Sequence, residues 1–470
     1  MNNTTVRIDH IAIKYFKSTR YGEVSLAKGA KDHDASIAGL YGQNGSGKTA
    51  LIDAIALLKL ALTATPIPVQ YADFVNVDAE SAYFKFEFSI IDKNRSASYK
   101  TKYEFSLRKI PNESLSNASE PIHETEPYRA ELFNEVLSCS YESPDTKLKM
   151  QNIVNAQAAE PFGPHTKLTA LTGGQKPTIT NLLVAKKLAA RTATSFVFSN
   201  DLIDVVRKNC QDEHYITLFN ALVFYGNACL FVIDTRTSGL ISFNAQPFAF
   251  RVDNEAGRRF GQLAIPLNQP AQLNEEDYEL TKIIVNNMNI VLTQIIPGLT
   301  IGIVDLGKQL SPKGNPMNRV EFISRRNGKV IPLRYESEGI KKIVSILQLL
   351  IVMYNNDSVT VAIDELDSGI FEYLLGELLR IISQRGKGQL IFTSHNFRPL
   401  ETLDKSFIVF ATANPDNRYI RMTNIKTNNN LRDYYYRDIM LGEQEEPIYE
   451  TTNNSEIALA FREAGVSCDS

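Results

Sequence analysis

Alternation of apolar and polar positions predicts strands in the first part of the chain. Residues 6–15 alternate in this way, residues 23–26 form a candidate hairpin partner, and residues 36–41 predict a third strand that runs straight into a glycine-rich turn. After the turn, residues 50–62 carry leucine and isoleucine at helical spacing, and two prolines follow. This segment therefore predicts a strand, a loop and a helix in that order.

The middle of the chain has a different character. Alternation predicts strands at 82–91 and 98–107, and the polar stretch from 111 to about 164, rich in Pro, Ser, Asn and Glu, is typical of irregular and partly mobile structure. Beyond it we expect helices at 202–208 and 276–296 and strands at 230–234 and 248–252. No heptad pattern persists for three turns, so the sequence predicts a large α+β insert without a long coiled coil.

The last third returns to dense regular structure. The expected strands are 300–305, 319–324, 358–363, 389–393 and 406–411, and the expected helices are 338–354 and 371–384. Strands that alternate with helices of this length imply a parallel sheet covered on both faces. We expect an α/β fold in which residues 1–65 and 300–425 form one domain, 66–299 an insert and 426–470 a C-terminal segment.

Composition narrows the class of protein. The 50 Lys and Arg residues nearly cancel the 53 Asp and Glu residues, so no overall field attracts nucleic acid or an acidic membrane. The four cysteines have no CxxC pair, which indicates a reducing cytoplasm rather than a disulfide framework, and the N-terminus has no signal-like segment. The longest uncharged run, 215–233, is broken by Asn220 and Gly226, so it predicts a buried helix, a turn and a strand instead of a membrane span.

The glycine-rich turn carries a motif with specific chemistry. Residues 42–49 fit the phosphate-binding pattern GxxxxGK[ST] between a predicted strand and a predicted helix. Glycines let backbone N–H groups surround phosphates, Lys48 would reach the β- and γ-phosphate oxygens, and Thr49 would offer a hydroxyl to Mg²⁺. ATP and Mg²⁺ are therefore the expected ligands. The expected binding residues are Gly42, Asn44, Gly45, Ser46, Gly47, Lys48 and Thr49.

Two carboxylates follow the apolar run 359–363. A buried strand of a parallel sheet delivers the residues after its C-terminal end to the active-site edge. Asp364 is expected to hold Mg²⁺ through water, and Glu365 to accept a proton from the attacking water. Alone, this pair would equally suit an acidic helix cap after a core strand. Together with the phosphate loop, it predicts nucleotide hydrolysis.

Two further features are weaker when taken alone. Ser337 and the Gly339 amide stand at the start of a predicted helix, where an anion is favoured but a simple capping motif is the ordinary interpretation. His395 ends a predicted strand, a position at which a lone histidine is usually a polar loop residue. Their order along the chain makes them informative, because phosphate loop, Ser-x-Gly, Asp-Glu, Asp367 and histidine follow one another.

This order resembles the ATP-binding-cassette (ABC) ATPases, and in particular the heads of the SMC, RecF and OLD families, over about residues 5–65 and 300–425. The resemblance implies an ABC-ATPase head with a mixed β-sheet and flanking helices. It implies these roles: Walker A for Lys48 and Thr49, Walker B for Asp364 and Glu365, signature for Ser337 and Gly339, D-loop for Asp367, and switch histidine for His395. The signature departs from the usual Leu-Ser-Gly-Gly form, and Gln70 is only a weak Q-loop candidate. The family arrangement also implies a homo-oligomer, a dimer or larger, with composite ATP sites.

Residues 364–369, the helix that follows Phe371, and residues 393–396 resemble more specifically the stand-alone ATPases of bacterial anti-phage systems of the PARIS type. That resemblance implies a sensor and scaffold that holds a partner nuclease toxin. The tyrosine-rich segment 431–439 suits a partner contact, because Tyr and Arg dominate binding hot spots. The same tyrosines would equally pack the last helix onto the head.

Other classes of ATPase compete with this interpretation. A RecF-like DNA-binding repair ATPase is the main alternative, because basic residues interleave with aromatic ones at 93–109 and a second basic cluster lies at 325–329. Solvated edge hairpins have the same composition. An OLD-type nuclease is disfavoured because no DxD carboxylate set follows His395, and a transporter subunit is disfavoured by the large insert.

Overall fold

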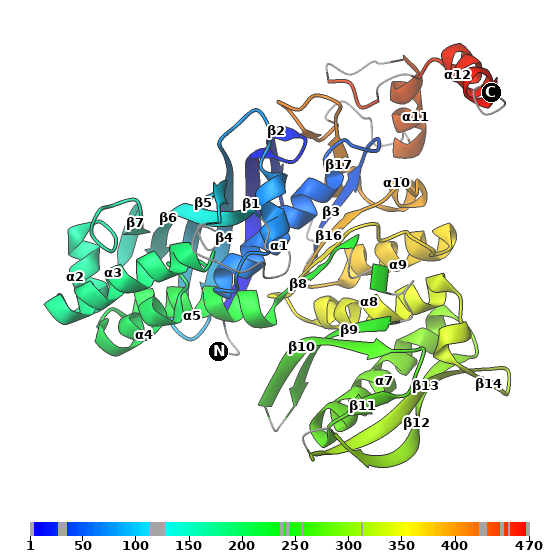
Figure 1. Cartoon of the computed structure of the whole chain (residues 1–470), viewed down its shortest axis with the longest axis horizontal. Helices are drawn as coiled ribbons and strands as arrows, with labels where there is room; N and C mark the ends of the chain where they lie inside the picture. Colours follow the sequence, from blue (N-terminus) through cyan, green and yellow to red (C-terminus); the bar gives the residue numbers. More distant parts are fainter. Residues whose placement is uncertain are drawn as a thin grey trace, which may run out of the picture.

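The structure is a computed structural model that describes residues 4–26, 35–112, 127–235, 239–240, 245–254, 257–311, 314–422, 430–441, 446–449 and 452–466 (Figure 1). The first elements are β1 (Thr4–Phe16), β2 (Thr19–Ser25), β3 (Ser36–Tyr41), α1 (Lys48–Leu62), η1 (Val69–Phe74), β4 (Ser81–Asp92), β5 (Ala97–Pro111), β6 (Tyr128–Glu142) and β7 (Lys147–Asn155). The middle elements are α2 (His165–Thr172), α3 (Lys176–Arg191), α4 (Asn200–Asn209), α5 (Glu213–Ala228), β8 (Leu230–Ile233), β9 (Ala245–Asn254), β10 (Gly257–Pro266), β11 (Ala271–Leu273), α7 (Glu275–Ile295), β12 (Leu299–Leu310), β13 (Pro316–Arg326) and β14 (Lys329–Pro332). The last elements are η3 (Leu333–Tyr335), α8 (Glu338–Asn355), β15 (Thr360–Ile363), α9 (Glu372–Arg385), β16 (Gln389–Thr393), α10 (Arg398–Thr402), η4 (Lys405–Phe407), β17 (Ile408–Ala411), β18 (Tyr419–Ile420), α11 (Leu431–Leu441) and α12 (Asn454–Val466).

The central sheet has the strand order β18-β17-β3-β16-β15-β8, and all neighbours are parallel except β18. Its middle strands are buried on both faces, as their continuous apolar runs require. Ala362 and Ile391 pack in the core that contains α1 and α5, whereas Val361 and Phe392 pack in the core that contains α8 and α9. The expected α/β fold with a mixed sheet and flanking helices is therefore confirmed.

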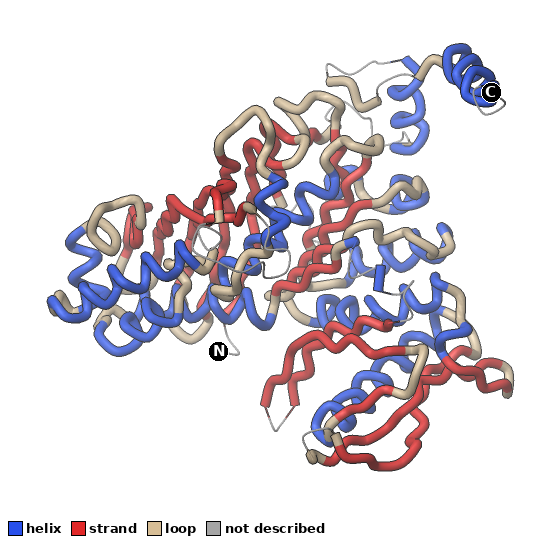
Figure 2. Tube along the Cα trace, viewed as in Figure 1, coloured by secondary structure: helices blue, strands red, loops and turns tan. Residues whose placement is uncertain are grey.

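A second, antiparallel sheet has the order β2-β1-β4-β5-β6-β7. Figure 2 shows that helices run along one side of it, and their residues share its hydrophobic core. Strand β4 alternates strictly between buried and less buried positions, and Phe84, Phe86 and Phe88 point inward. The alternating strands expected at 82–91 and 98–107 are thereby confirmed as β4 and β5.

The expectation of irregular structure from 111 to about 164 is wrong for the described part of that stretch. Residues 128–142 and 147–155 form β6 and β7, while residues 113–126 lie outside the described residues. Register shifts interrupt the pairing of β5 with β6 and of β6 with β7, and Glu131 and Glu135 are buried in β6. Because of these bulges and buried carboxylates, apolar and polar residues do not alternate regularly, so the sequence pattern does not indicate these strands.

The expected boundary at residues 65 and 66 lies inside one sheet, because β1 pairs with β4. Strand β8, which also falls in the expected insert, pairs with β15 in the central sheet. Helix α5 precedes β8 directly, which confirms the buried helix, turn and strand expected for residues 215–233. No described helix is long and apolar enough to cross a membrane.

The C-terminal segment packs on the head through α11. The Tyr435 ring is buried and stacks on Phe410, with 5.1 Å between ring centroids, and Arg432 pairs with Glu401 at 2.7 Å. The packing interpretation of the tyrosine-rich segment therefore holds for Tyr435. Helix α12 lies at the edge of the molecule beyond α11 (Figure 1).

Candidate nucleotide-binding site

The glycine-rich loop connects buried strand β3 to helix α1. Gly47 has φ 83°, and a Cβ added there would lie 2.9 Å from the Thr19 hydroxyl oxygen, so only glycine suits this position. Helix α1 begins at Lys48 with no side-chain cap. Its first N–H groups are consequently directed at the space inside the loop, where a phosphate would accept their hydrogen bonds.

Lys48 is buried within this loop. Its Nζ donates to the carbonyl oxygens of Gly42 at 2.8 Å and Gln43 at 3.0 Å. Burial lowers the pKa of Lys48, while the carboxylates of Asp364, Asp367 and Glu365 act in the opposite direction. The ammonium is thus held at the loop by weak neutral acceptors, which anionic phosphate oxygens would replace favourably.

Asp364 follows β15 and is almost completely buried, with 1% of its surface exposed. Its Oδ1 accepts a 2.6 Å hydrogen bond from the Thr393 hydroxyl, and its Oδ2 has no partner among the described residues. Glu365 has φ 49°, a strained backbone for a residue other than glycine, and its N–H donates to the Thr393 hydroxyl at 2.7 Å. Thr393, at the end of β16, therefore orients both acidic residues.

These groups meet at one cavity of about 360 Å³. It is lined by Lys17, Ser18, Asn44, Gly45, Gly47, Lys48, Thr49, Ala50, Asp364, Glu365, Thr393 and His395. The phosphate loop, the two carboxylates and the histidine, which are far apart in sequence, thus surround the same space. The unpartnered Oδ2 of Asp364 and the hydroxyl of Thr49 are the kind of oxygen ligands that suit Mg²⁺.

Asp367 does not line this cavity but fixes the segment that carries His395. Its Oδ2 accepts from the backbone N–H groups of His395 at 3.0 Å and Asn396 at 2.9 Å. Partial burial and the nearby Lys48 ammonium lower the pKa of His395, against the effect of the carboxylates. The imidazole is therefore mainly neutral at pH 7, so it can donate one hydrogen bond to an anionic ligand from its protonated ring nitrogen and accept another, for example from water, at the other.

The structure does not bring Ser337 and Gly339 to the cavity within one chain. Ser337 is exposed and caps α8, with its Oγ accepting from the Ile340 N–H at 3.3 Å. A Cβ added at Gly339 would lie 2.0 Å from the carbonyl oxygen of Gly369, so this glycine permits close packing against the loop that follows Asp367. Gln70, the Q-loop candidate, lies in η1 and does not line the cavity either.

Sequence reasoning missed two residues in the turn between β1 and β2. The Lys17 ammonium pairs with the Asp53 carboxylate and lies 4.1 Å from the centroid of the Phe74 ring. The Ser18 hydroxyl donates to the Gly45 carbonyl at 3.2 Å. Both residues line the cavity. A Lys-Ser pair in a hairpin turn looks ordinary in sequence, and only the pairing of β1 and β2 places it beside the phosphate loop.

Sequence reasoning also missed support from the C-terminal side. The Tyr419 hydroxyl, in β18, donates to the Gly47 carbonyl at 2.7 Å. The Arg418 guanidinium donates to the Ser18 carbonyl and, at 2.7 Å, to that of Thr412. These two side chains join the phosphate loop and the β1–β2 turn to the end of β17, and we call them the Arg418–Tyr419 clasp.

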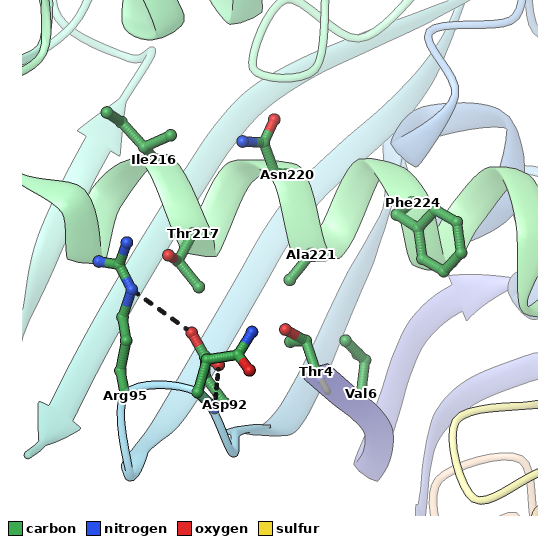
Figure 3. Close-up of a pocket in the computed structure, with 10 residues that line it drawn as sticks. Thr4, Val6, Asp92, Arg95, Ile216, Thr217, Asn220, Ala221 and Phe224 are labelled. Atoms are coloured by element: carbon green, nitrogen blue, oxygen red, sulfur yellow. Dashed lines mark hydrogen bonds and ion pairs between the residues drawn. The ribbon is translucent and has the colours of Figure 1, made fainter. Parts of the chain in front are cut away.

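A second cavity, of about 230 Å³, lies between α5, the start of β1 and the turn between β4 and β5 (Figure 3). Arg95 lines it and pairs with Asp92 at 3.7 Å and with Glu213. The Asp92 carboxylate also accepts from the Asn94 N–H at 3.0 Å. These charges are satisfied within the chain, in contrast to those at the phosphate loop.

Residues 10–160 match the AAA domain family. This span contains the phosphate loop, α1 and most of the antiparallel sheet, and the match supports an ATPase. No curated protein matches the sequence.

Solved structures with similar arrangements include three Smc heads. An Smc head bound to the C-terminal winged-helix domain of ScpA is 14% identical, with a TM-score of 0.38 and coverage of 89% of this chain and 98% of that chain. A Pyrococcus furiosus Smc head with an extended coiled coil, bound to the C-terminal domain of ScpA, is 13% identical, with a TM-score of 0.39 and coverage of 89% and 96%. The SMC head domain from Thermotoga maritima is 14% identical, with a TM-score of 0.36 and coverage of 89% and 99%.

Proposed function

We propose that the chain binds and hydrolyses ATP in a Mg²⁺-dependent manner as an ABC-type ATPase. The observation that carries this proposal is the meeting of Lys48, Thr49, Asp364, Glu365 and His395 at one cavity. Lys48 and the first N–H groups of α1 would bind the phosphates, and Thr49 and Asp364 would hold Mg²⁺. When bound, Mg²⁺ would neutralise charge on the β- and γ-phosphates. Glu365 would accept the proton of the attacking water, and His395 would bond the γ-phosphate.

Titration of the protein with MgATP tests the assignment of the loop. Lys48→Ala should abolish measurable binding, because it removes the cation that the loop holds at Gly42 and Gln43. Thr49→Ala should weaken binding only when Mg²⁺ is present, and the matched Thr49→Ser variant should retain it because the hydroxyl is kept. If Lys48→Ala bound ATP as tightly as wild type, the loop assignment would be wrong.

We further propose that the active unit is a homo-oligomer whose ATP sites are shared between copies. Ser337 is exposed and lies outside the cavity of its own chain, so it is available to contact a nucleotide held by another copy. A mixture of Lys48→Ala and Ser337→Arg chains, each inactive alone, should regain turnover at the one intact site of each mixed pair. Full ATPase activity in protein that light scattering finds strictly monomeric would contradict the shared site.

The cellular role that we propose is that of an anti-phage sensor and scaffold of the AriA type, the ATPase subunit of the PARIS system, which holds and releases a partner nuclease toxin. The support is the resemblance of residues 364–369 and 393–396 to such ATPases. Co-purification with the products of neighbouring genes tests this role. We expect a small nuclease to be retained, and its absence together with tight DNA binding would favour a repair role.

A RecF-like DNA-binding ATPase is the second candidate, and one basic surface favours it. In the β4–β5 hairpin, Lys100 pairs with Asp9 at 2.8 Å and Lys109 with Asp73 at 2.6 Å, and the interleaved rings of Tyr99, Tyr103 and Phe105 are buried. That hairpin is therefore poorly suited to phosphate contacts. Arg325, Arg326 and Lys329, at the turn between β13 and β14, are exposed.

DNA titration at several salt concentrations separates the two candidates. For a RecF-like protein, Arg325→Ala with Arg326→Ala should weaken binding and reduce the salt slope by about 1 to 2. Lys100→Ala is the matched control, because its ammonium is already paired. Absence of DNA binding by the wild-type protein would remove this candidate.

A further inference from the structure

Helix α12 presents its apolar side chains to solvent. Ile457 is 43% exposed, Leu459 is 55% exposed and Phe461 is 75% exposed, and every residue from 454 to 464 is exposed. Ile457 and Phe461 are four residues apart, so they lie on one face of the helix, together with Ala460. A helix of 13 residues is marginal in water without packing, so this apolar face needs a surface to cover it.

The same chain carries an apolar groove that no described helix fills. It has a volume of about 270 Å³ and lies between α7, α8 and α9. Leu350, Tyr354, Leu378 and Ile381 are among its lining residues, and Ile381 is 47% exposed. Partner proteins commonly bind such grooves through a helix that inserts two large apolar side chains one turn apart.

Charge at one end of the groove matches α12. Arg385 and Lys387, at the C-terminal end of α9, are exposed, and the Lys387 N–H donates to the carbonyl of the groove residue Tyr354 at 3.1 Å. Helix α12 carries Glu456 and Glu463 beside its apolar face, whereas Arg462 lies toward the side of Leu459, so the charges nearest that face are acidic. Opposite charges at the rim of an interface favour one orientation and faster association.

We propose that α12 docks in the α7–α8–α9 groove of a second copy of this chain, with Ile457 and Phe461 as anchors. In the chain by itself, α12 stands beyond α11, away from α7, α8 and α9 (Figure 1). Each copy therefore has one uncovered helix and one open groove. In a pair of copies, the helix of each copy can occupy the groove of the other. The contact joins different surfaces of the two copies, so it builds a reciprocal pair or a larger ring.

This interface is separate from the shared ATP site. The groove lies along the C-terminal half of α8, whereas Ser337 caps the N-terminus of the same helix. A chain can therefore use the groove to bind the α12 helix of one copy and Ser337 to contact the ATP site of another. When ATP is bound, the two contacts together build an assembly larger than a dimer. The docking of α12 itself does not depend on nucleotide, so it is tested without ATP and independently of the proposed ATPase function.

Sedimentation of the full chain without nucleotide tests the contact. We expect wild type to self-associate, and Phe461→Asp and Ile381→Asp each to weaken association by more than tenfold. Leu459→Asp is the matched control, because Leu459 lies on the other side of α12 and is similarly exposed. Phe461 and Ile381 are both exposed, so the variants should unfold at the wild-type temperature. A wild-type chain that stays monomeric at high concentration overturns the proposal.

Mixing the two variants identifies the occupant. The Ile381→Asp chain keeps an unchanged α12, and the Phe461→Asp chain keeps an unchanged groove. Docking of α12 from the first chain in the groove of the second should therefore restore association in the mixture. If α12 docked in its own groove, the mixture would stay dissociated and the proposal would fail. Equal association of both variants with wild type, alone and mixed, would show that another surface joins the copies and would also overturn it.

Discussion

Two buried carboxylates, one at each sheet, differ in how completely they are satisfied. Glu135, in the antiparallel sheet, accepts hydrogen bonds from the Tyr103 hydroxyl at 2.7 Å, the Ser195 hydroxyl and the Phe196 N–H at 2.7 Å. Asp364, directly after β15 of the central sheet, accepts one bond from Thr393 and leaves Oδ2 without a partner among the described residues. Their exposed fractions are nearly equal, 3% and 1%.

The difference in hydrogen bonding distinguishes a structural carboxylate, Glu135, from a carboxylate that is suited to bind a ligand, Asp364. A buried acceptor without a partner costs free energy, so folding alone gives no reason to keep one. Donors surround Glu135, which ties β6 to the residues before α4, and burial nevertheless raises its pKa. Asp364 instead lines the cavity and keeps its Oδ2 without a partner among the described residues. Between these two carboxylates, burial does not distinguish the site residue, whereas incomplete hydrogen bonding does.

The largest effect that we expect is on turnover. Glu365→Gln should keep ATP binding and slow hydrolysis by about 100-fold or more, because it removes only the proton acceptor. Glu135→Gln should leave the turnover number unchanged at a temperature where both variants are folded. Steady-state ATPase assays measure both. Wild-type turnover in Glu365→Gln would exclude the role of Glu365.

Replacing each buried carboxylate with its amide should affect the two residues differently. The change at Glu135 should lower the stability of the protein, whereas the change at Asp364 should weaken nucleotide binding. Glu135→Gln places an NH₂ group among donors and should lower the free energy of unfolding by about 1–3 kcal/mol. Asp364→Asn keeps the Thr393 bond and removes a buried charge, so it should not lower stability, but it should weaken MgATP binding. Urea unfolding and MgATP titration of both variants measure the contrast, and equal destabilisation would refute it.

A smaller effect is expected at the Arg418–Tyr419 clasp. Tyr419→Phe removes the bond to the Gly47 carbonyl and keeps the ring, so ATP affinity should fall by about two- to tenfold, the equivalent of one hydrogen bond. Tyr103→Phe is the matched control, because it removes a buried hydroxyl bond in the other sheet. If both variants lose similar stability but only Tyr419→Phe loses ATP affinity, Tyr419 positions the phosphate loop. Unchanged affinity in Tyr419→Phe would leave the clasp a purely structural feature.

The same contrast explains which parts of the molecule the sequence predicts. Strands β3, β15 and β16 and their motif residues are local patterns, so the fold class and the residues around the cavity follow from the chain order. Strands β6 and β7 were missed because bulges and buried carboxylates break the alternation. Lys17, Ser18 and Tyr419 were missed because each reaches the site only through pairing or packing of distant elements.

The smallest expected effect compares two cations on α1. Burial lowers the pKa of both Lys48 and Lys59, but carboxylates oppose the change only at Lys48. Burial takes the pKa of Lys59 to about 8, and its Nζ lies 5.4 Å from the centroid of the Phe231 ring. The Lys59 ammonium is therefore desolvated without a compensating carboxylate. Its charge should lower the free energy of unfolding, and replacement by a neutral side chain should increase it.

The pH dependence of unfolding tests this cost. Between pH 8 and the unfolded pKa of about 10.4, the unfolded chain binds more protons at Lys59 than the folded chain, so this group raises stability as pH increases. Below pH 8 both states are charged and the full cost applies. Lys59→Met should therefore be more stable than wild type at pH 7, by about 1 kcal/mol for a partly exposed side chain, with the advantage disappearing near pH 10. Urea unfolding at pH 7 and pH 10 measures both values, and an advantage that did not change with pH would show that packing, not charge, accounts for it.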